Sequence, residues 1–308
     1  MAKRQFNDVS LQRLKNAIAG LPGLAESLKA QKISLQNIPE IHVFGYGSLP
    51  DKPHYEPDSI TTAYLWNYRR DMCCESVRSG TSKFKGLTLG LDQVDGSIVP
   101  GAILTYQSQT AEQLCEMLEA LAKREVVEEH PIYRFEMLEI EKENGSKAMA
   151  ITCVADPTSP GYHGDGLSLW ETRKLSDAEQ EEVSLERKAR IIAEANGFYN
   201  RSGIHATSKS YFDRYVRIPM EENPISTDPR ELKQCSEVER KRRIALALEQ
   251  SYMKKLAIKI DEHREILRER MPKHVEILEQ AEAKQIERWR RQRQKSQNKF
   301  NKPPKFTK

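Results

Sequence analysis

The sequence has 308 residues, of which 38% are hydrophobic and 31% are charged, and its formal net charge is +4. It contains no apolar run of about 18 residues, so we expect no transmembrane segment, and the N-terminal MAKRQFNDVSLQRLKNAIAG lacks the apolar core of a signal peptide. The five cysteines form no CxxC pair and the seven histidines form no HExxH motif, so we expect a cytoplasmic protein with neither a disulfide framework nor a metal site.

Residues 1–40 are predicted to form an N-terminal helical extension. Between residues 8 and 31 the apolar positions follow a broadly helical spacing, which Pro22 and Gly23 interrupt. We therefore expect two short helices that pack onto the domain that follows and carry no chemistry of their own.

Residues 41–222 are predicted to form a compact α+β domain. Helices are expected at residues 110–123, 176–195 and 208–214. Because strands dominate the first half and hairpin-length turns join them, the pattern favours a largely antiparallel, barrel-like sheet over a parallel one. Short segments rich in Val, Ile, Tyr and Thr, bounded by Gly, Asp, Ser and Pro, indicate strands at residues 41–45, 61–67, 72–77, 86–92, 100–106, 133–141 and 147–154.

Residues 223–308 are predicted to form a basic helical module with a disordered end. The segment NPISTDPR provides a Pro-rich joint, and residues 231–295 contain no glycine and a single proline, Pro272. Apolar residues recur mostly at spacings of three and four, which predicts one long helix or two joined near Pro272.

Charge is distributed unevenly between this module and the rest of the chain. From Arg230 onward there are 23 Lys and Arg against 12 Asp and Glu, whereas the residues before it carry 26 against 33. A basic tail therefore follows an acidic body. We expect the tail either to contact a nucleic acid, an anionic membrane or an acidic protein, or to dock on the acidic body, or to be a solvated helix.

Six segments together resemble the γ-glutamylcyclotransferase superfamily, and in particular its ChaC branch of glutathione-specific enzymes. The opening VFGYGSL is similar to the signature of that branch, and the other segments follow in family order over roughly residues 41–216. They are VFGYGSL (43–49), NYRRDMCCESVRSGT (67–81), KGLTLGL (85–91), AKREVVEEHPIYRFEML (122–138), CVADPTSPGYHG (153–164) and AEANGFYNRSGIHATSKSYF (193–212).

The resemblance implies a γ-glutamylcyclotransferase-like barrel with flanking helices and a cofactor-independent reaction. In this reaction the α-amine of a γ-glutamyl group attacks its own γ-carbonyl, so that 5-oxoproline closes and the attached amine leaves; with glutathione the leaving group is cysteinylglycine. The resemblance makes Glu125 the catalytic residue. Physically, a carboxylate within hydrogen-bond reach can take the ammonium proton and return it to the leaving nitrogen.

The turn at Gly45, Tyr46, Gly47, Ser48 and Leu49 is expected to bind the substrate. Glycines permit close backbone approach and a positive φ, and consecutive amides facing one way form an anion-binding hollow. Such a hollow suits the substrate α-carboxylate, and its amides can polarise the γ-carbonyl. The alternative is an ordinary tight turn with Tyr46 in the core.

Four other side chains complete the sequence-based hypothesis. Arg78 is expected to bind a substrate carboxylate or to brace the pocket, with a structural salt bridge as the alternative. Tyr162 matches a family tyrosine and is expected to hydrogen-bond the γ-glutamyl portion, whereas packing is favoured for Tyr133. Cys73 and Cys74 are expected to be buried in a strand rather than to act as nucleophiles.

The sequence therefore predicts an enzyme for a small γ-glutamyl substrate, with glutathione as the first candidate. Two alternatives stay open at this stage. One is a non-catalytic protein that keeps the fold and acts through its basic C-terminal helix, and the other is a cyclotransferase for a γ-glutamylamine. Arg124 and Glu125 could also be no more than a solvated helix terminus.

Overall fold

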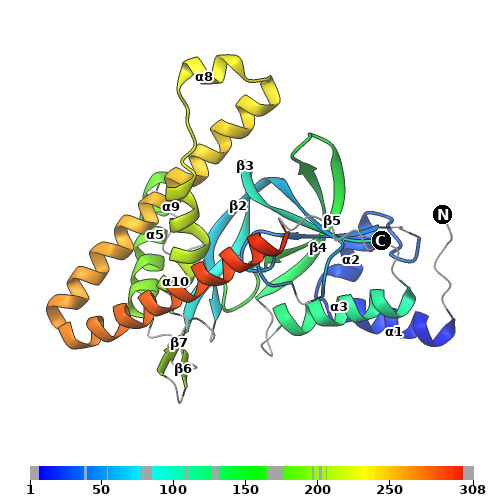
Figure 1. The fold of residues 1–308 in the computed structure, drawn as a ribbon, viewed down its shortest axis with the longest axis horizontal. Helices are drawn as coiled ribbons and strands as arrows, with labels where there is room; N and C mark the ends of the chain where they lie inside the picture. Colours follow the sequence, from blue (N-terminus) through cyan, green and yellow to red (C-terminus); the bar gives the residue numbers. More distant parts are fainter. Residues whose placement is uncertain are drawn as a thin grey trace. The chain divides into compact units, whose positions relative to one another are not determined.

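The computed structural model describes residues 7–37, 40–53, 55–76, 79, 85–107, 110–126, 132–164, 176–195, 198–200, 203–205 and 207–300. The chain divides into two compact units (Figure 1). The first comprises Met1–Glu75, Leu89–Ser184 and Pro224–Tyr252, and the second comprises Ser76–Thr88, Leu185–Asn223 and Met253–Lys308.

The first unit is built on a five-stranded barrel in the order β1-β3-β2-β4-β5. β1 pairs antiparallel with β3, β4 pairs antiparallel with both β2 and β5, and a parallel pairing of β1 with β5 closes the barrel. This mixed, mostly antiparallel barrel with flanking helices confirms the predicted fold class (Figure 1). The strands are β1 (Glu40–Gly45), β2 (Ser59–Ser76), β3 (Gly86–Gln107), β4 (Tyr133–Lys142) and β5 (Lys147–Ala155).

Two long strands replace four short ones of the prediction. Residues 61–67 and 72–76 lie in the single strand β2, and residues 86–92 and 100–106 lie in β3; the last residue of the predicted segment 72–77 lies outside the described residues. The polar residues between the predicted pairs do not end the strands. In β2 the chain passes through Asn67 at a φ of 63°, and in β3 through Gly96 at a φ of 74°. The side chain of Asn67 accepts a hydrogen bond from the Gly96 amide at 3.1 Å, so the two irregular positions support each other.

Alternating side chains of the barrel belong to two separate apolar clusters. On β5, Met149 and Ile151 join the larger cluster, whereas Ala150 and Val154 join the smaller one. Such alternation is what a strand with two buried faces requires. The larger cluster also contains the apolar faces of three helices, α1 (Asp8–Ala19), α2 (Leu24–Ala30) and α3 (Ala111–Glu125).

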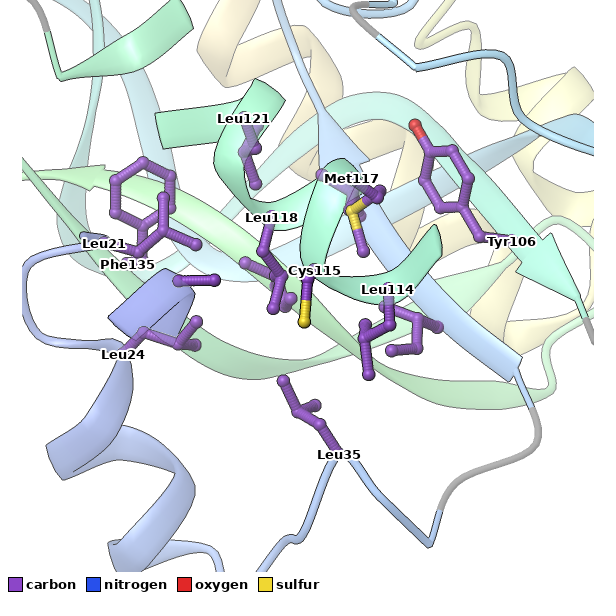
Figure 2. Close-up of a cluster of buried hydrophobic side chains, with 14 of the residues drawn as sticks. Leu21, Leu24, Leu35, Tyr106, Leu114, Cys115, Met117, Leu118, Leu121 and Phe135 are labelled. Atoms are coloured by element: carbon purple, nitrogen blue, oxygen red, sulfur yellow. The ribbon is translucent and has the colours of Figure 1, made fainter. Parts of the chain in front are cut away.

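Figure 2 shows how these helices cover the barrel. Leu114, Leu118 and Leu121 of α3 gather with Leu24 of α2 and with Phe135 of β4. The break between α1 and α2 falls at Pro22 and Gly23, as predicted, and Gly23 takes a φ of 82°. The N-terminal extension is therefore part of the core packing of the first unit.

The start of α9 also packs in the first unit. Ala245 and Leu246 contact Ile98, Tyr64 and Trp66 of the barrel strands. Glu249 accepts a hydrogen bond from Arg70 at 2.6 Å. The helices of this region are α8 (Pro229–Gln234) and the first part of α9 (Glu237–Arg270).

The second unit is mainly helical. The prediction of two long helices joined near Pro272 is confirmed, because α9 ends at Arg270 and α10 (Pro272–Phe300) starts with the proline. Trp289 of α10 packs edge-on against Tyr215, with ring centroids 6.4 Å apart. The other elements are most of α5 (Asp177–Glu194), β6 (Phe198–Asn200), β7 (Gly203–His205), α6 (Ser208–Phe212), a π-helix (Asp213–Arg217) and α7 (Ile218–Glu222).

Within the described residues, no helix combines the length and the apolarity that crossing a membrane requires.

The packing of α3 predicts a large stability difference between two leucines. Leu118 is fully buried, whereas Leu248 is 66% exposed on α9. Leu118→Ala should lower the free energy of unfolding by about 2–5 kcal/mol, because it leaves a cavity in the larger cluster. Leu248→Ala should change it by less than about 0.5 kcal/mol. Urea unfolding followed by circular dichroism measures both, and equal losses would contradict the assigned burial.

Candidate active site

The turn after β1 is anchored on both apolar clusters. Tyr46 packs with the smaller cluster, its ring centroid 6.4 Å from that of Phe44, and Leu49 packs with the larger one. Gly47 and Ser48 lie in the bend between them, and the Ser48 carbonyl accepts a hydrogen bond from the Lys52 amide at 3.2 Å. The backbone of residues 45–49 is thus held at both ends.

Gly45 is required for a different reason from the one the sequence suggested. A positive φ was expected, but Gly45 does not adopt one. A Cβ at this position would lie 2.8 Å from Cδ of Pro50 and 3.2 Å from Cβ of Leu49. The glycine therefore allows the chain to fold back closely on itself.

Helix α3 carries the candidate catalytic residue at its end. Thr110 caps the helix through a capping box with Gln113, and the apolar face then packs on the larger cluster. The backbone leaves the helical region at Val126. Because the buried face of α3 fixes its rotation, its last turn places Arg124 and Glu125 beside the turn at 45–49.

The guanidinium of Arg124 joins these two parts of the site. Its Nε donates to Oε1 of Glu125 at 2.5 Å and its Nη2 donates to Oγ of Ser48 at 2.7 Å. Its Nη1 donates to the carbonyl of Lys52. One side chain therefore contacts Glu125 and the turn at once. Sequence reasoning paired Arg124 with Glu125 but did not foresee the contacts with residues 48 and 52.

Both members of this pair are shielded from solvent. The side chains of Arg124 and Glu125 are 9% and 22% exposed, which contradicts the alternative of a solvated helix terminus. Glu125 also affects Cys153 of β5, since burial and then the charge of Glu125 raise the pKa of that thiol well above its ordinary value.

A small apolar cavity lies next to this cluster. Its volume is about 10 Å³, close to that of a single water-sized sphere. It is too small to hold a γ-glutamyl group. The lining residues come from β1, β3, α3 and the chain after the turn, and they are Val43, Leu49, Tyr55, Tyr106, Met117 and Leu121.

Tyr162 belongs to a second polar cluster. Its hydroxyl donates to Asp92 at 2.6 Å, and burial together with the charge of Asp92 raises the pKa of Tyr162. Its backbone forms an antiparallel bridge with Cys74. Among the described residues no hydrogen bond joins Tyr162 to Glu125, so this structure does not bring the two predicted site residues into contact. No pattern in the sequence pointed to Asp92, which lies 70 positions from Tyr162.

The remaining predicted residues are placed as follows. Cys73 and Cys74 are fully buried, as expected, and burial raises the pKa of Cys73 well above its ordinary value. The Tyr133 hydroxyl donates to the carbonyl of Leu89 at 2.7 Å and its ring packs beside the two cysteines. Arg78 lies outside the described residues.

One group of side chains has the composition of a metal site. Ligand atoms of Asp71, Cys73 and Asp92 lie within 4.8 Å of one another, and all three residues are buried. Both carboxylates already accept hydrogen bonds from tyrosine hydroxyls, Asp71 from Tyr252 at 3.0 Å and Asp92 from Tyr162. Each of the two buried carboxylates therefore has a hydrogen-bond donor within the structure.

The model of the ChaC-like protein family matches residues 41–199, which is just over half of the chain. The chain belongs to the ChaC-like family. The match includes the turn at 45–49, Arg124, Glu125 and Tyr162, so both polar clusters lie in the family region of this ChaC-like protein. No curated protein gave a match.

Solved structures with some likeness to this ChaC-like protein come from three organisms. A yeast γ-glutamyl cyclotransferase specific to glutathione is 14% identical, with 74% of this chain and 98% of that chain covered and a TM-score of 0.48. Human uncharacterized protein LOC79017 is 16% identical, with coverages of 48% and 99% and a TM-score of 0.31. YkqA from Bacillus subtilis is 19% identical, with coverages of 43% and 44% and a TM-score of 0.31.

The effect of the Glu125 charge on the Cys153 thiol predicts a change in thiol reactivity. Glu125→Gln removes the negative charge, which lowers the pKa of Cys153 and raises its thiolate fraction at a given pH. Alkylation of Cys153 by iodoacetamide at pH 8 should therefore become faster in the variant, as measured by mass spectrometry. The rate at the partly exposed Cys235, which follows α8, is the internal control. An unchanged rate at Cys153 would contradict the placement of Glu125.

Proposed function

We propose that this ChaC-like protein is a γ-glutamylcyclotransferase that acts on glutathione, with Glu125 as its catalytic acid–base. The observation that carries the proposal is the shared contact of Arg124 with Ser48 and Glu125. It joins the family's Gly-Tyr-Gly-Ser turn to the carboxylate that the family resemblance makes catalytic. Family membership supplies the reaction class, and the geometry supports a common site.

The proposed reaction is an internal acyl transfer. The α-ammonium of the γ-glutamyl group gives one proton to the carboxylate of Glu125, and the neutral nitrogen then attacks the γ-carbonyl carbon. A new C–N bond closes the five-membered ring of 5-oxoproline, and the original amide C–N bond breaks. The departing nitrogen takes this proton back from Glu125 and also takes up the second proton that the attacking nitrogen loses on becoming the lactam N–H, so that cysteinylglycine leaves as its ammonium form. No water or other reactant is consumed.

Arg124 has a positioning role in this proposal. Its Nε binds Oε1 of Glu125, which fixes the plane of the carboxylate and leaves Oε2 for the proton of the substrate. Its Nη2 holds Oγ of Ser48, so the hydroxyl proton of Ser48 can point to a ligand. Correct orientation of a reacting group contributes strongly to rate, and a displacement of about 1 Å can cost roughly 100-fold.

The turn at 45–49 is proposed to receive the charged end of the substrate. Its amides would bind the α-carboxylate and polarise the γ-carbonyl as negative charge develops on the oxygen. Close packing of Gly45 against Pro50 and the anchoring of Tyr46 and Leu49 limit the movement of this turn. The backbone is thus organised before the substrate arrives, which is what electrostatic stabilisation requires.

The proposal predicts that the wild-type protein releases 5-oxoproline and cysteinylglycine from glutathione in equal amounts. Glu125→Gln should lower kcat by roughly 100- to 10,000-fold, because the amide cannot accept the proton. Glu116→Gln, on the exposed side of the same helix, should keep wild-type turnover. Mass spectrometry quantifies both products.

Three outcomes would contradict this proposal. Near wild-type turnover by Glu125→Gln would refute the role of that residue. Turnover of a γ-glutamylamine but not of glutathione would keep the reaction and change the substrate. If the folded wild-type protein converts none of a panel of γ-glutamyl compounds, the non-catalytic alternative is the better description.

The positioning role of Arg124 predicts a loss of kcat with little change of KM. Arg124→Lys keeps the charge but cannot make the three contacts of a guanidinium, and we expect kcat to fall roughly 10- to 100-fold. A purely structural role would lower the melting temperature while leaving kcat per folded molecule unchanged. Ser48→Ala should add little to the kinetic loss of Arg124→Lys, because one variant already removes the contact that the other would remove.

A further inference from the structure

Helix α10 presents a continuous positive face to solvent. Within residues 284–295 of this face, Lys284 is followed by Arg288, Arg291 and Lys295 at intervals of four, three and four residues. At 100° per residue these four positions lie within about 60° of one another around the helix axis. All four side chains are exposed. We refer to Lys284, Arg288, Arg291 and Lys295 as the basic stripe.

The opposite face of α10 is used for packing within the second unit. Val275 and Leu278 are fully buried, and Trp289 packs on Tyr215. Further along, Arg293 forms an ion pair with Glu222 at 3.0 Å. The rotation of the helix is therefore fixed, and the basic stripe must face solvent.

Acidic residues offset little of this charge. Glu287, which binds Arg291, is the only acidic residue from position 284 to the C-terminus. Arg290 adds a fifth exposed cation close to the stripe. The surface is therefore strongly positive, with one ion pair on it.

The types of residue exposed on this face favour one class of anionic partner over the others. Between residues 284 and 295 every exposed residue is Lys, Arg, Glu or Gln. A helix that inserts into a membrane surface needs exposed apolar residues, and a protein interface needs buried apolar or aromatic anchors. The aromatic residue of this region, Trp289, is already buried. Binding of a phosphate backbone requires only cationic side chains, and arginine can bind phosphate in bidentate fashion.

We infer that the basic stripe of α10 binds the phosphate backbone of a nucleic acid without sequence preference. The four cations span about 16 Å along the helix, a length over which one strand of B-form DNA carries about five phosphates. No exposed aromatic residue in this segment is available to stack on a base. This binding does not depend on the proposed cyclotransferase activity.

The test uses the full-length protein and two fluorescent probes, a mixed-sequence 20-base-pair DNA duplex and a 20-nucleotide RNA. Fluorescence anisotropy should show binding at 50 mM NaCl that weakens by roughly 100-fold at 200 mM, since up to four counterions per site are released. K284Q/R288Q/R291Q/K295Q should bind at least about tenfold more weakly and with a shallower salt dependence.

A charge-matched control separates the stripe from net charge. It replaces four exposed lysines of the first unit by glutamine and should stay within about threefold of wild type, since its cations lie outside the stripe. Circular dichroism verifies that both variants are folded. The control lysines are Lys15, Lys29, Lys32 and Lys123.

Four outcomes would overturn the inference. The first is an absence of binding to both probes at 50 mM NaCl, and the second is an equal loss of affinity in the stripe and control variants. The third is binding to phosphatidylserine vesicles without binding to either nucleic acid. The fourth is tighter binding to polyglutamate than to the nucleic acids. The third outcome would assign the face to a membrane surface, and the fourth to an acidic protein.

Discussion

The buried guanidinium of Arg124 is the interaction on which the candidate site depends. A charged group at 9% exposure is costly unless its donors are paired. Three of its nitrogens find acceptors, on Glu125, on Ser48 and on the backbone of Lys52. Since these acceptors come from two separate segments, satisfying one side chain fixes the end of α3 against the turn after β1. The core packing of α3 in turn determines where the guanidinium lies.

Much of the fold could be predicted because its elements have strong periodic patterns. The two N-terminal helices, α3 and the two long C-terminal helices were indicated by apolar spacing. The seven predicted strand segments, which correspond to the five barrel strands, were indicated by their Val, Ile, Tyr and Thr content. The prediction divided β2 and β3 because polar residues in the middle of each strand resemble turns. In the structure Arg69 and Asp71 are buried there and meet Tyr252 of α9. A local pattern cannot show a partner more than 180 positions away.

The same limit applies to the candidate site. The pattern pointed to Glu125 and Ser48, and the structure joins them through Arg124. The sequence pattern could not reveal that Tyr162 donates to Asp92, nor that Gly45 allows the close approach of Pro50. Both contacts depend on tertiary packing. In the second unit the limit concerns charged residues, whose partners apolar spacing cannot reveal. Part of the buried surface is ionic, with Arg264 and Glu282 only 3% and 4% exposed and 2.6 Å apart.

The participation of α9 in both units has a practical consequence. A truncated protein ending at residue 222 looks like a natural enzyme domain, since the Pro-rich joint begins there. It would, however, leave Tyr64, Trp66 and Ile98 without the cover of Ala245 and Leu246. Exposed aromatic surface of this kind promotes self-association. Recombinant fragments of this chain should therefore keep the first turns of α9, up to Tyr252, so that the barrel does not aggregate in solution.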